Sequence, residues 1–364
     1  MQRRATTGDN KLKLGFFGSN CSSGLAATLV PERWSGSWED NLQLAQVSDA
    51  VGIDFILPVA RWKGYGGPSN FENATFETLT WASGLLAATK QLTVFGTVHV
   101  PLIHPVFAAK QMVTADHICR GRFGLNLVCG WNADEFNMFG IEQREHDMRY
   151  AYGEEWLRIV KQLWRSEGSF DFDGAFFHLK DAVADPKPYG GTQPLVLNAG
   201  SSPAGTAFAS RNADFLFIPI RWMEQAVETV ADAAALGRTV GVFTSVNVVC
   251  RPTQREAEEY LNYYADERAD WEAVGHMIDA GTRGSSTTMR PELFQQLRIR
   301  YAAGAGGWIV AGDPDHVATS FAEIAAAGFT GLALGFVNYL VEFPYFRDEV
   351  LPRLARLGLR APIA

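Results

Sequence analysis

The stretch 121–131 places one amide side chain inside an otherwise apolar run. Phe123, Leu125, Leu127 and Val128 surround Asn126, and such a run is typical of a parallel strand that is buried on both faces. A buried amide needs a hydrogen-bond partner. Asn126 therefore either satisfies a neighbouring backbone group or contacts a bound ligand.

A second stretch, 198–205, combines small residues and hydroxyls (NAGSSPAG). Its order predicts a strand, a tight turn and a helix that starts near Pro203. Backbone N–H groups together with Gly200, Ser201 and Ser202 could cradle a phosphate group at the helix N-terminus. The alternative is that Ser201 or Ser202 simply caps the helix.

Arg149 and Tyr150, at the start of an amphipathic pattern over 149–163, could reach the same phosphate. The alternative is that both are solvated helix residues.

These residues must be positioned by a repeating architecture. Buried apolar runs recur at 11–18, 53–60, 92–100, 121–131, 194–199, 215–220, 240–250 and 331–337, with a shorter one at 308–312. Helical patterns separate them, for example 38–51 before Gly52 and the helix that Asp313-Pro314 begins. About eight alternating strands and helices predict an α/β fold, a closed (β/α)8 TIM barrel in a single domain over 1–364. A doubly wound open sheet is the alternative, but no G-x-G-x-x-G follows the first strand.

Two segments depart from this alternation. Residues 1–10 are polar, and we expect them to be disordered. Residues 267–306 are rich in charge, glycine and Ser/Thr. We expect an irregular barrel insertion there, which could act as an active-site lid.

In such a barrel, function lies at the carboxyl ends of the strands. Those ends carry no carboxylate pair, no Ser-His-Asp set and no metal-ligand cluster, and His99 with His104 is weak evidence for zinc. Amides, hydroxyls and aromatics predominate, which suits an organic cofactor that carries the difficult chemistry itself. Three nearby residues each have two interpretations. His99 is either a proton relay or a structural histidine. Trp131 either forms a wall of the pocket or packs in the core, and Cys21 either lines the pocket or is a small buried hydrophobic residue.

Composition limits the partners. The chain has 364 residues, of which 47% are hydrophobic and 20% charged, with a net charge of −8. This balance argues against nucleic acid, and no apolar run approaches the length of a membrane span. Four cysteines without CxxC spacing favour a reducing cytoplasm over a disulfide framework.

Several motifs together resemble the bacterial-luciferase-like, flavin-dependent monooxygenases. They are RWKGYGG at 61–67, Ala-Asp-His at 115–117 leading into GRFGLNLVCGW, Glu135, Arg149-Tyr150, DPKP at 185–188, NAGSSPAG at 198–205 and Ala213-Asp214. The resemblance spans about 12–358 and is greatest to the subgroup around pyrimidine monooxygenase and dimethylsulfone monooxygenase.

The resemblance implies reduced FMN, supplied by a separate NADH- or NADPH-dependent flavin reductase, with O2 as co-substrate. Ala60 and Arg61 would approach the flavin ring, Thr97 and Asn126 would be catalytic and contact the ring, and Glu135 would lie beside it. Arg149, Tyr150, Gly200, Ser201 and Ser202 would hold the phosphate end. In that subgroup oxygen adds at the central-ring nitrogen of the flavin.

Where pyrimidine monooxygenase has Ile-Lys, this chain has Ala60-Arg61, so the contacts to ring and substrate would differ. We therefore predict a cytoplasmic, homodimeric or homotetrameric enzyme. It would insert one oxygen atom into a small organosulfur compound or N-heterocycle via a flavin peroxide. The alternatives are an alkanesulfonate-type monooxygenase, a deazaflavin-dependent reductase, a catalytically silent flavin-binding protein and an unrelated barrel that binds a sugar phosphate.

Overall fold

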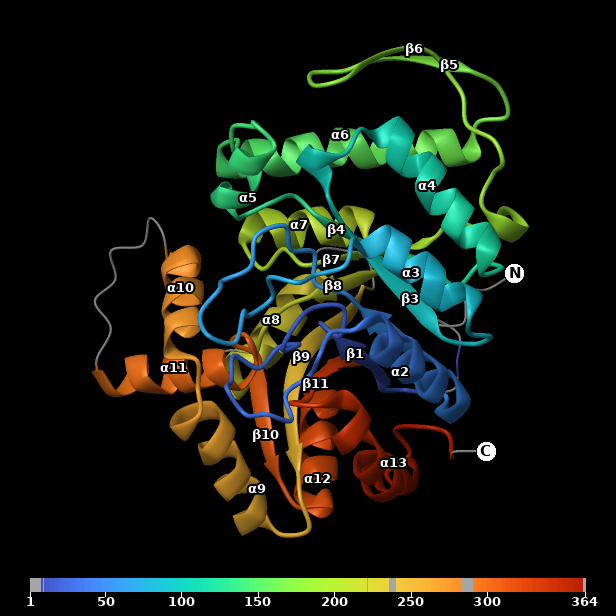
Figure 1. The fold of residues 1–364 in the computed structure, drawn as a ribbon. Helices are drawn as coiled ribbons and strands as arrows, with labels where there is room; N and C mark the ends of the chain where they lie inside the picture. The colour runs from blue at the N-terminus through green and yellow to red at the C-terminus, as the bar shows by residue number, and fades with distance from the viewer. Residues whose placement is uncertain (1–7, 9, 221, 236–239, 283–290, 363–364) are drawn as a thin grey trace.

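The computed structural model describes residues 8, 10–220, 222–235, 240–282 and 291–362. Its centre is a closed barrel of parallel strands (Figure 1). Around the barrel they are β1 (Lys13–Phe17), β2 (Phe55–Leu57), β3 (Thr93–His99), β4 (Phe123–Val128), β7 (Leu195–Asn198), β8 (Phe215–Phe217), β9 (Gly241–Cys250) and β11 (Gly331–Gly335). β11 closes the ring on β1, with Ala333 opposite Gly15. The predicted TIM barrel is confirmed.

β9 is longer than the other barrel strands because it has three partners. Its first residues pair with β8, its middle with β11, and its last five with β10 (Trp308–Gly312). β10 is the short strand predicted at 308–312, and it extends the sheet beside the barrel.

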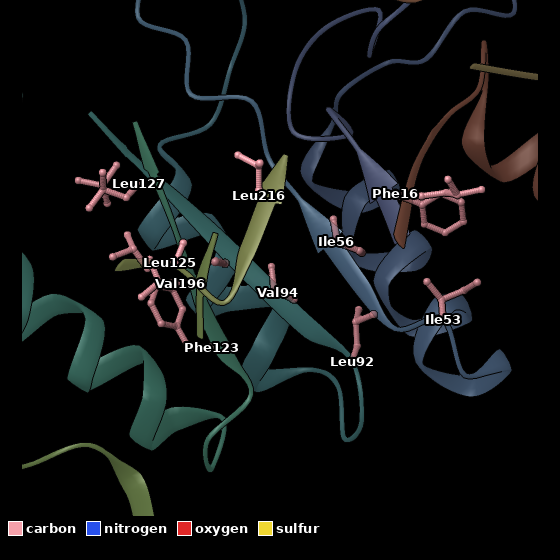
Figure 2. Close-up of a cluster of buried hydrophobic side chains, with 14 of the residues drawn as sticks. Phe16, Ile53, Ile56, Leu92, Val94, Phe123, Leu125, Leu127, Val196 and Leu216 are labelled. Carbon is pink, nitrogen blue, oxygen red and sulfur yellow. The ribbon is translucent and has the colours of Figure 1, made fainter. Parts of the chain in front are cut away.

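Side chains alternate between the two faces of each barrel strand. Phe55, Phe95, Leu197, Phe215 and Phe243 form one buried cluster with their neighbours, and these side chains fill the barrel. The outward positions pack under the helices: Figure 2 shows Phe123, Leu125 and Leu127 on the same side of β4.

Helices surround the barrel and follow most strands (Figure 1). They are α2 (Trp38–Val51), α3 (Thr78–Ala87), α4 (Pro105–Ile118), α5 (Ala133–Met138), α6 (His146–Arg165), α7 (Pro203–Asn212), α8 (Met223–Ala235), α9 (Gln254–Asn262), α10 (Trp271–Thr282), α11 (Pro291–Gly304), α12 (Pro314–Ala326) and α13 (Tyr339–Arg356). Local signals set several ends: Gly52 ends α2 with a φ of 80°, and Asp313 caps α12, whose first residue is Pro314. Among the described helices, none is long and apolar enough to cross a membrane.

Two connections are enlarged. Between β4 and β7, the antiparallel hairpin of β5 (Phe170–Asp173) and β6 (His178–Ala182) extends beyond α6. Glu155 of α6 anchors it by accepting hydrogen bonds from the backbone N–H groups of Ala175, Phe176 and Phe177.

Between β9 and β11 lies the segment for which we expected irregular structure. That expectation is wrong for its described part, since α10 and α11 lie there. Val274, Met277 and Ile278 of α10 and Ala303 of α11 are buried in a second core with Phe71. Residues 283–290 of the predicted lid, and 1–7 and 9 of the predicted disordered terminus, lie outside the described residues.

Candidate functional site

Thr97 and Asn126 lie opposite each other on the neighbouring strands β3 and β4. Phe95 belongs to the barrel interior, so Thr97 and His99 occupy the interior face of β3 above it. Leu125 and Leu127 belong to the outer core, which places Asn126 on the interior face of β4. The fold thus brings both predicted catalytic residues to the carboxyl end of the barrel interior.

Their hydrogen bonds leave one atom unused. Asn126 Nδ2 donates to Thr97 Oγ1 at 3.0 Å, and Thr97 Oγ1 donates to the backbone oxygen of Pro58 at 2.8 Å. Asn126 Oδ1 is buried and has no partner among the described residues. An acceptor without a donor in a buried site is costly, and a bound ligand with an N–H or O–H group would supply the missing donor.

A cavity of about 300 Å³, which we name the α7 cavity, opens between the ends of β4 and β7 and the first residues of α6 and α7. Its lining includes the five residues predicted to hold phosphate: Arg149, Tyr150, Gly200, Ser201 and Ser202. Ser202 caps α7, because its hydroxyl accepts from the backbone N–H of Gly205 at 3.2 Å. The capping alternative is therefore confirmed for Ser202, while Ser201 is exposed in the cavity.

The N-terminus of α7 is nevertheless built to receive a ligand. Among the described residues, no acceptor partners the backbone N–H groups of Ser201, Ser202 and Ala204. A Cβ at Gly205 would lie 2.6 Å from Tyr150 Oη and 2.7 Å from the Cα atom of Gly200. The two glycines thus let the turn, α7 and Tyr150 approach closely.

Arg149 supplies positive charge to the α7 cavity. Its Nη1 donates to the backbone oxygen of Gly130 at 2.6 Å, and its buried Nε has no partner in the described chain. His146, which the sequence did not indicate, lines the same cavity and packs against Tyr150 with 5.4 Å between ring centroids. Their four-residue spacing on one helix is the signal that could have identified His146.

A larger cavity of about 490 Å³, which we name the β3 cavity, lies over the ends of β2 and β3. The predicted residues Ala60, Arg61, Thr97 and His99 line one side of it. Apolar side chains line much of the rest, including those of Leu102, Ile103, Phe107 and Phe139. The two cavities lie at the ends of neighbouring strands, because His99 of the β3 cavity is paired with Val128 of the α7 cavity.

Arg61 is held between two buried carboxylates. Its Nε lies 2.9 Å from Glu72 Oε2, and its Nη1 lies 3.2 Å from Glu135 Oε1. Glu135 Oε1 also accepts from the backbone N–H groups of Trp62 and Lys63. Glu135 therefore fixes the loop that carries Arg61, and sequence reasoning missed Glu72 entirely.

The charges of this cluster perturb their neighbours. Burial alone would lower the pKa of Arg61, but Glu72, Tyr65 and Glu135 more than offset it, so that pKa is raised. Burial raises the pKa of Glu72 by more than the neighbouring charge of Arg61 lowers it, so that pKa is raised overall. Burial and the charge of Arg61 lower the pKa of His99 to about 4, although Glu135 Oε2 lies 4.0 Å from its Nδ1. His99 is therefore uncharged at neutral pH.

Trp131 and Cys21 occupy different surroundings. Trp131 lines the α7 cavity and lies 5.5 Å from the guanidinium carbon of Arg61, so it stands between that cavity and the Arg61 cluster. Cys21 is fully buried and is not among the lining residues of either cavity. Its Sγ donates to the backbone oxygen of Gly18 at 3.1 Å, and burial raises the pKa of its thiol.

Taken together, the predicted residues other than Cys21 lie in or beside two adjoining cavities at one end of the barrel. The described part of the chain contains no cluster of three or more histidine, cysteine or acidic side chains arranged to hold a metal ion. The arrangement offers a phosphate-type cradle at the ends of β4 and β7 and a largely apolar chamber at the ends of β2 and β3. Thr97 lines the chamber and is hydrogen-bonded to Asn126 of β4.

Comparison with known proteins gives a consistent result. Residues 16–331 match the family described as Luciferase-like monooxygenase. The chain is 30% identical to the FMNH(2)-dependent dimethylsulfone monooxygenase of Pseudomonas fluorescens, over 97% of each chain. It is 29% identical to the pyrimidine monooxygenase RutA of a Bradyrhizobium species, over 96% of this chain and 99% of the relative.

Solved structures share the fold at lower identity. The crystal structure of the long-chain alkane monooxygenase LadA superposes with a TM-score of 0.85 at 22% identity, covering 96% of this chain and 92% of the other. An F420-dependent secondary alcohol dehydrogenase superposes with a TM-score of 0.70 at 17% identity, covering 94% of this chain and 99% of the other. At these identities the similarity concerns the fold.

Proposed function

The chain belongs to the luciferase-like monooxygenase family, and from that premise we propose that it is an FMN-dependent monooxygenase that transfers one oxygen atom from O2 to a small organic molecule. The relatives named above support an organosulfur compound or an N-heterocycle as the substrate class. The observation that carries the proposal is that the two cavities lie at the ends of β3 and β4, where Thr97 and Asn126 are hydrogen-bonded to each other.

The residues present fit FMN. Arg149, Ser201, Ser202 and the N-terminus of α7 would hold the phosphate, since the buried Nε of Arg149 lacks an acceptor within the described chain. Tyr150 would flank that end of the molecule. Asn126 Oδ1 would accept a hydrogen bond from the ring, which removes the cost of its unpaired state.

When bound, reduced FMN supplies the electrons that activate dioxygen. Thr97 and Asn126 would orient the reacting groups, because their mutual hydrogen bond fixes both side chains on rigid strands. Ala60 and Arg61 would border the reaction site, and the apolar side chains of the β3 cavity would exclude water from it. Neutral His99 could accept or donate a proton there.

We further propose a separate NADH- or NADPH-dependent flavin reductase as partner, because the dimethylsulfone relative is named for its use of FMNH2. A homodimer or homotetramer in the cytoplasm is the assembly we propose. Exposed Val341 and Leu357, which lie outside both cavities, support association. The four free cysteines support a reducing compartment. Sedimentation analysis would test the assembly, and a single monomeric species would contradict it.

The segment 267–306 is proposed to act as a cover over the site. His276 of α10 is hydrogen-bonded to the backbone oxygen of Tyr65 at 2.7 Å, on the loop that carries Arg61. Binding of FMN and substrate should then slow proteolysis within α10 and α11. Unchanged cleavage there would contradict a covering role.

The function itself is tested by a reductase-coupled reaction under ¹⁸O2, with reduced FMN and a panel of sulfones and N-heterocycles. The expected result is a product that carries a single labelled oxygen atom, with water as the other product. Tight FMN binding without any labelled product would indicate a silent flavin-binding protein. Hydride transfer from a reduced deazaflavin without oxygen incorporation would indicate the reductase alternative.

A further inference from the structure

The β3 cavity has a polar inventory that selects against anions. Arg61 is the one Lys or Arg side chain among its described lining residues. The positive charge of Arg61 is already opposed by Glu72 at 2.9 Å and Glu135 at 3.2 Å. Both carboxylates are buried with Arg61, so water screens this pairing little.

The other ionisable side chains that line the cavity are Glu77, His99 and His104. Glu77 lines the cavity and uses its carboxylate to cap α3, accepting from the backbone N–H groups of Leu79 and Thr80. His99 is neutral, as described above. His104 caps α4, and its Nδ1 accepts from the backbone N–H of Val106 at 3.3 Å. An anion that entered this cavity would therefore meet the carboxylate of Glu77 and no uncommitted Lys or Arg side chain among the described lining residues.

The unsatisfied polar atom of the cavity is also an acceptor. Among the described lining side chains, the buried atom without a partner is Gln111 Oε1. An amide oxygen repels an anionic oxygen but accepts from an N–H or O–H group. With a volume of about 490 Å³, the cavity lies in the range of sites that hold ring-sized organic ligands.

We propose that the β3 cavity is the substrate pocket, that it selects an uncharged and largely apolar molecule, and that Glu72 and Glu135 set this selection by cancelling the charge of Arg61. The proposal rests on the proposed function for the identity of the site as a substrate site. It assigns to Glu72 a role in specificity: without its carboxylate, the guanidinium of Arg61 would attract sulfonates and other anions.

Two probes of nearly equal shape test the proposal: methyl phenyl sulfone, which is uncharged, and benzenesulfonate, in which an anionic oxygen replaces the methyl group. Their binding to the full-length protein is measured by calorimetry at neutral pH, with saturating oxidised FMN. Desolvation of an anion without a free cationic partner is unfavourable, so the sulfone should bind at least about tenfold more tightly. Equal binding, tighter binding of benzenesulfonate, or no binding of the sulfone would overturn the proposal.

Glu72→Gln and Glu135→Gln keep the shape of each side chain and remove its charge. Either variant should reduce the ratio of sulfone affinity to benzenesulfonate affinity at least about threefold, because one of the two negative charges that oppose Arg61 is removed. Glu342→Gln is the matched control, because Glu342 is a buried carboxylate paired with Arg251 at 2.9 Å away from the cavity. An unchanged preference in both cavity variants would overturn the role of the two carboxylates.

The location of binding is tested on α4. Phe107 lines the cavity at 60% exposure, whereas Ile118 ends the same helix at 48% exposure and is not a lining residue. Phe107→Ala should weaken sulfone binding severalfold and Ile118→Ala should not. Equal effects would place the binding elsewhere.

These experiments measure binding without turnover and are repeated without flavin. Failure of the proposed oxygen transfer would appear in the ¹⁸O experiment, whereas failure of the charge selection would appear only in the calorimetric comparison of the two probes.

Discussion

Replacement of Asn126 by alanine should separate ligand binding from stability. In the ligand-free protein, Asn126 makes one side-chain hydrogen bond, to Thr97 Oγ1 at 3.0 Å, and leaves its buried Oδ1 without a partner in the described chain. A residue that serves the fold alone would satisfy both ends of its amide. Asn126 instead keeps an acceptor for which the described chain has no donor.

The expected magnitudes follow from these contacts. The substitution removes one hydrogen bond worth about 1 kcal/mol and leaves a small cavity that costs about 1 kcal/mol. It also removes an unsatisfied buried acceptor, which returns about 1–3 kcal/mol. The free energy of unfolding of the FMN-free protein should therefore change by no more than about 1 kcal/mol. FMN affinity should fall between about twofold and tenfold, through loss of the hydrogen bond to the ring.

Asn198→Ala is the matched control at the end of β7. Asn198 is also buried, but its Nδ2 donates to the backbone oxygen of Leu127 at 2.8 Å and its Oδ1 accepts from the backbone N–H of Gly200 at 3.1 Å. Its removal leaves two buried backbone groups unpaired and should cost about 2–4 kcal/mol.

Urea unfolding of the two FMN-free variants and titration of each with FMN measure both quantities. The reasoning is refuted if Asn126→Ala destabilises the protein as much as Asn198→Ala. It is equally refuted if Asn126→Ala binds FMN and supports oxygen transfer as the unaltered protein does.

Three further predictions concern the same site. Gly205→Ala should weaken FMN binding at least about tenfold, because the added Cβ would lie 2.6 Å from Tyr150 Oη. Gly275→Ala is the control, since the space around its Cβ is open. Equal FMN affinities of the two variants would contradict the role of the α7 N-terminus in FMN binding. Arg149→Lys should lower the affinity for FMN about tenfold, because the guanidinium fork that pairs with the phosphate is lost. The affinity for riboflavin, which has no phosphate, should be unchanged. Equal losses of affinity for both flavins would contradict a contact between Arg149 and the phosphate. The pKa of His99 is about 4 in the folded protein, compared with an ordinary 6.5, so folding favours the neutral side chain. This contribution to the free energy of unfolding, about 3 kcal/mol, is lost as the pH falls from about 6.5 to about 4. His99→Gln should flatten that part of the stability–pH curve, and an unaltered slope would contradict the buried neutral state.

Local signals in the sequence predicted the barrel and two candidate parts of its site. The apolar run around Asn126 and the turn of small residues before Pro203 are each contained within about ten residues, so their chemistry is readable from neighbours alone. Because parallel strands end at the same edge of a barrel, strand ends far apart in sequence could be placed together. The pairing of Thr97 with Asn126, 29 residues away, came from the family resemblance, and the two residues do lie at such neighbouring strand ends.

Interactions that depend on loop shape were not predictable. Glu72 reaches Arg61 because the intervening loop turns back through Asn70 and Glu72, both with a φ of 53°. Nothing in residue periodicity encodes such a turn. The α10 helix was missed for another reason: charges and glycines in 267–306 outweighed the recurrence of Ala273, Val274, Met277 and Ile278, which does have helical spacing.

The β5–β6 hairpin was overlooked although its signal is present. Phe170 and Phe172 alternate with aspartates, and Asp173-Gly174 is a common hairpin turn. A two-stranded hairpin buries little apolar surface, so its pattern is short and weak. Its anchor on Glu155, made entirely to backbone N–H groups, has no counterpart in sequence pattern.

The account of the site is tested most directly by a crystal structure of the protein with FMN. We predict the phosphate at the N-terminus of α7, in contact with Arg149, Ser201 and Ser202, and a flavin ring group that donates a hydrogen bond to Asn126 Oδ1. A phosphate bound elsewhere, or an Asn126 Oδ1 that remains without a partner in the complex, would contradict it.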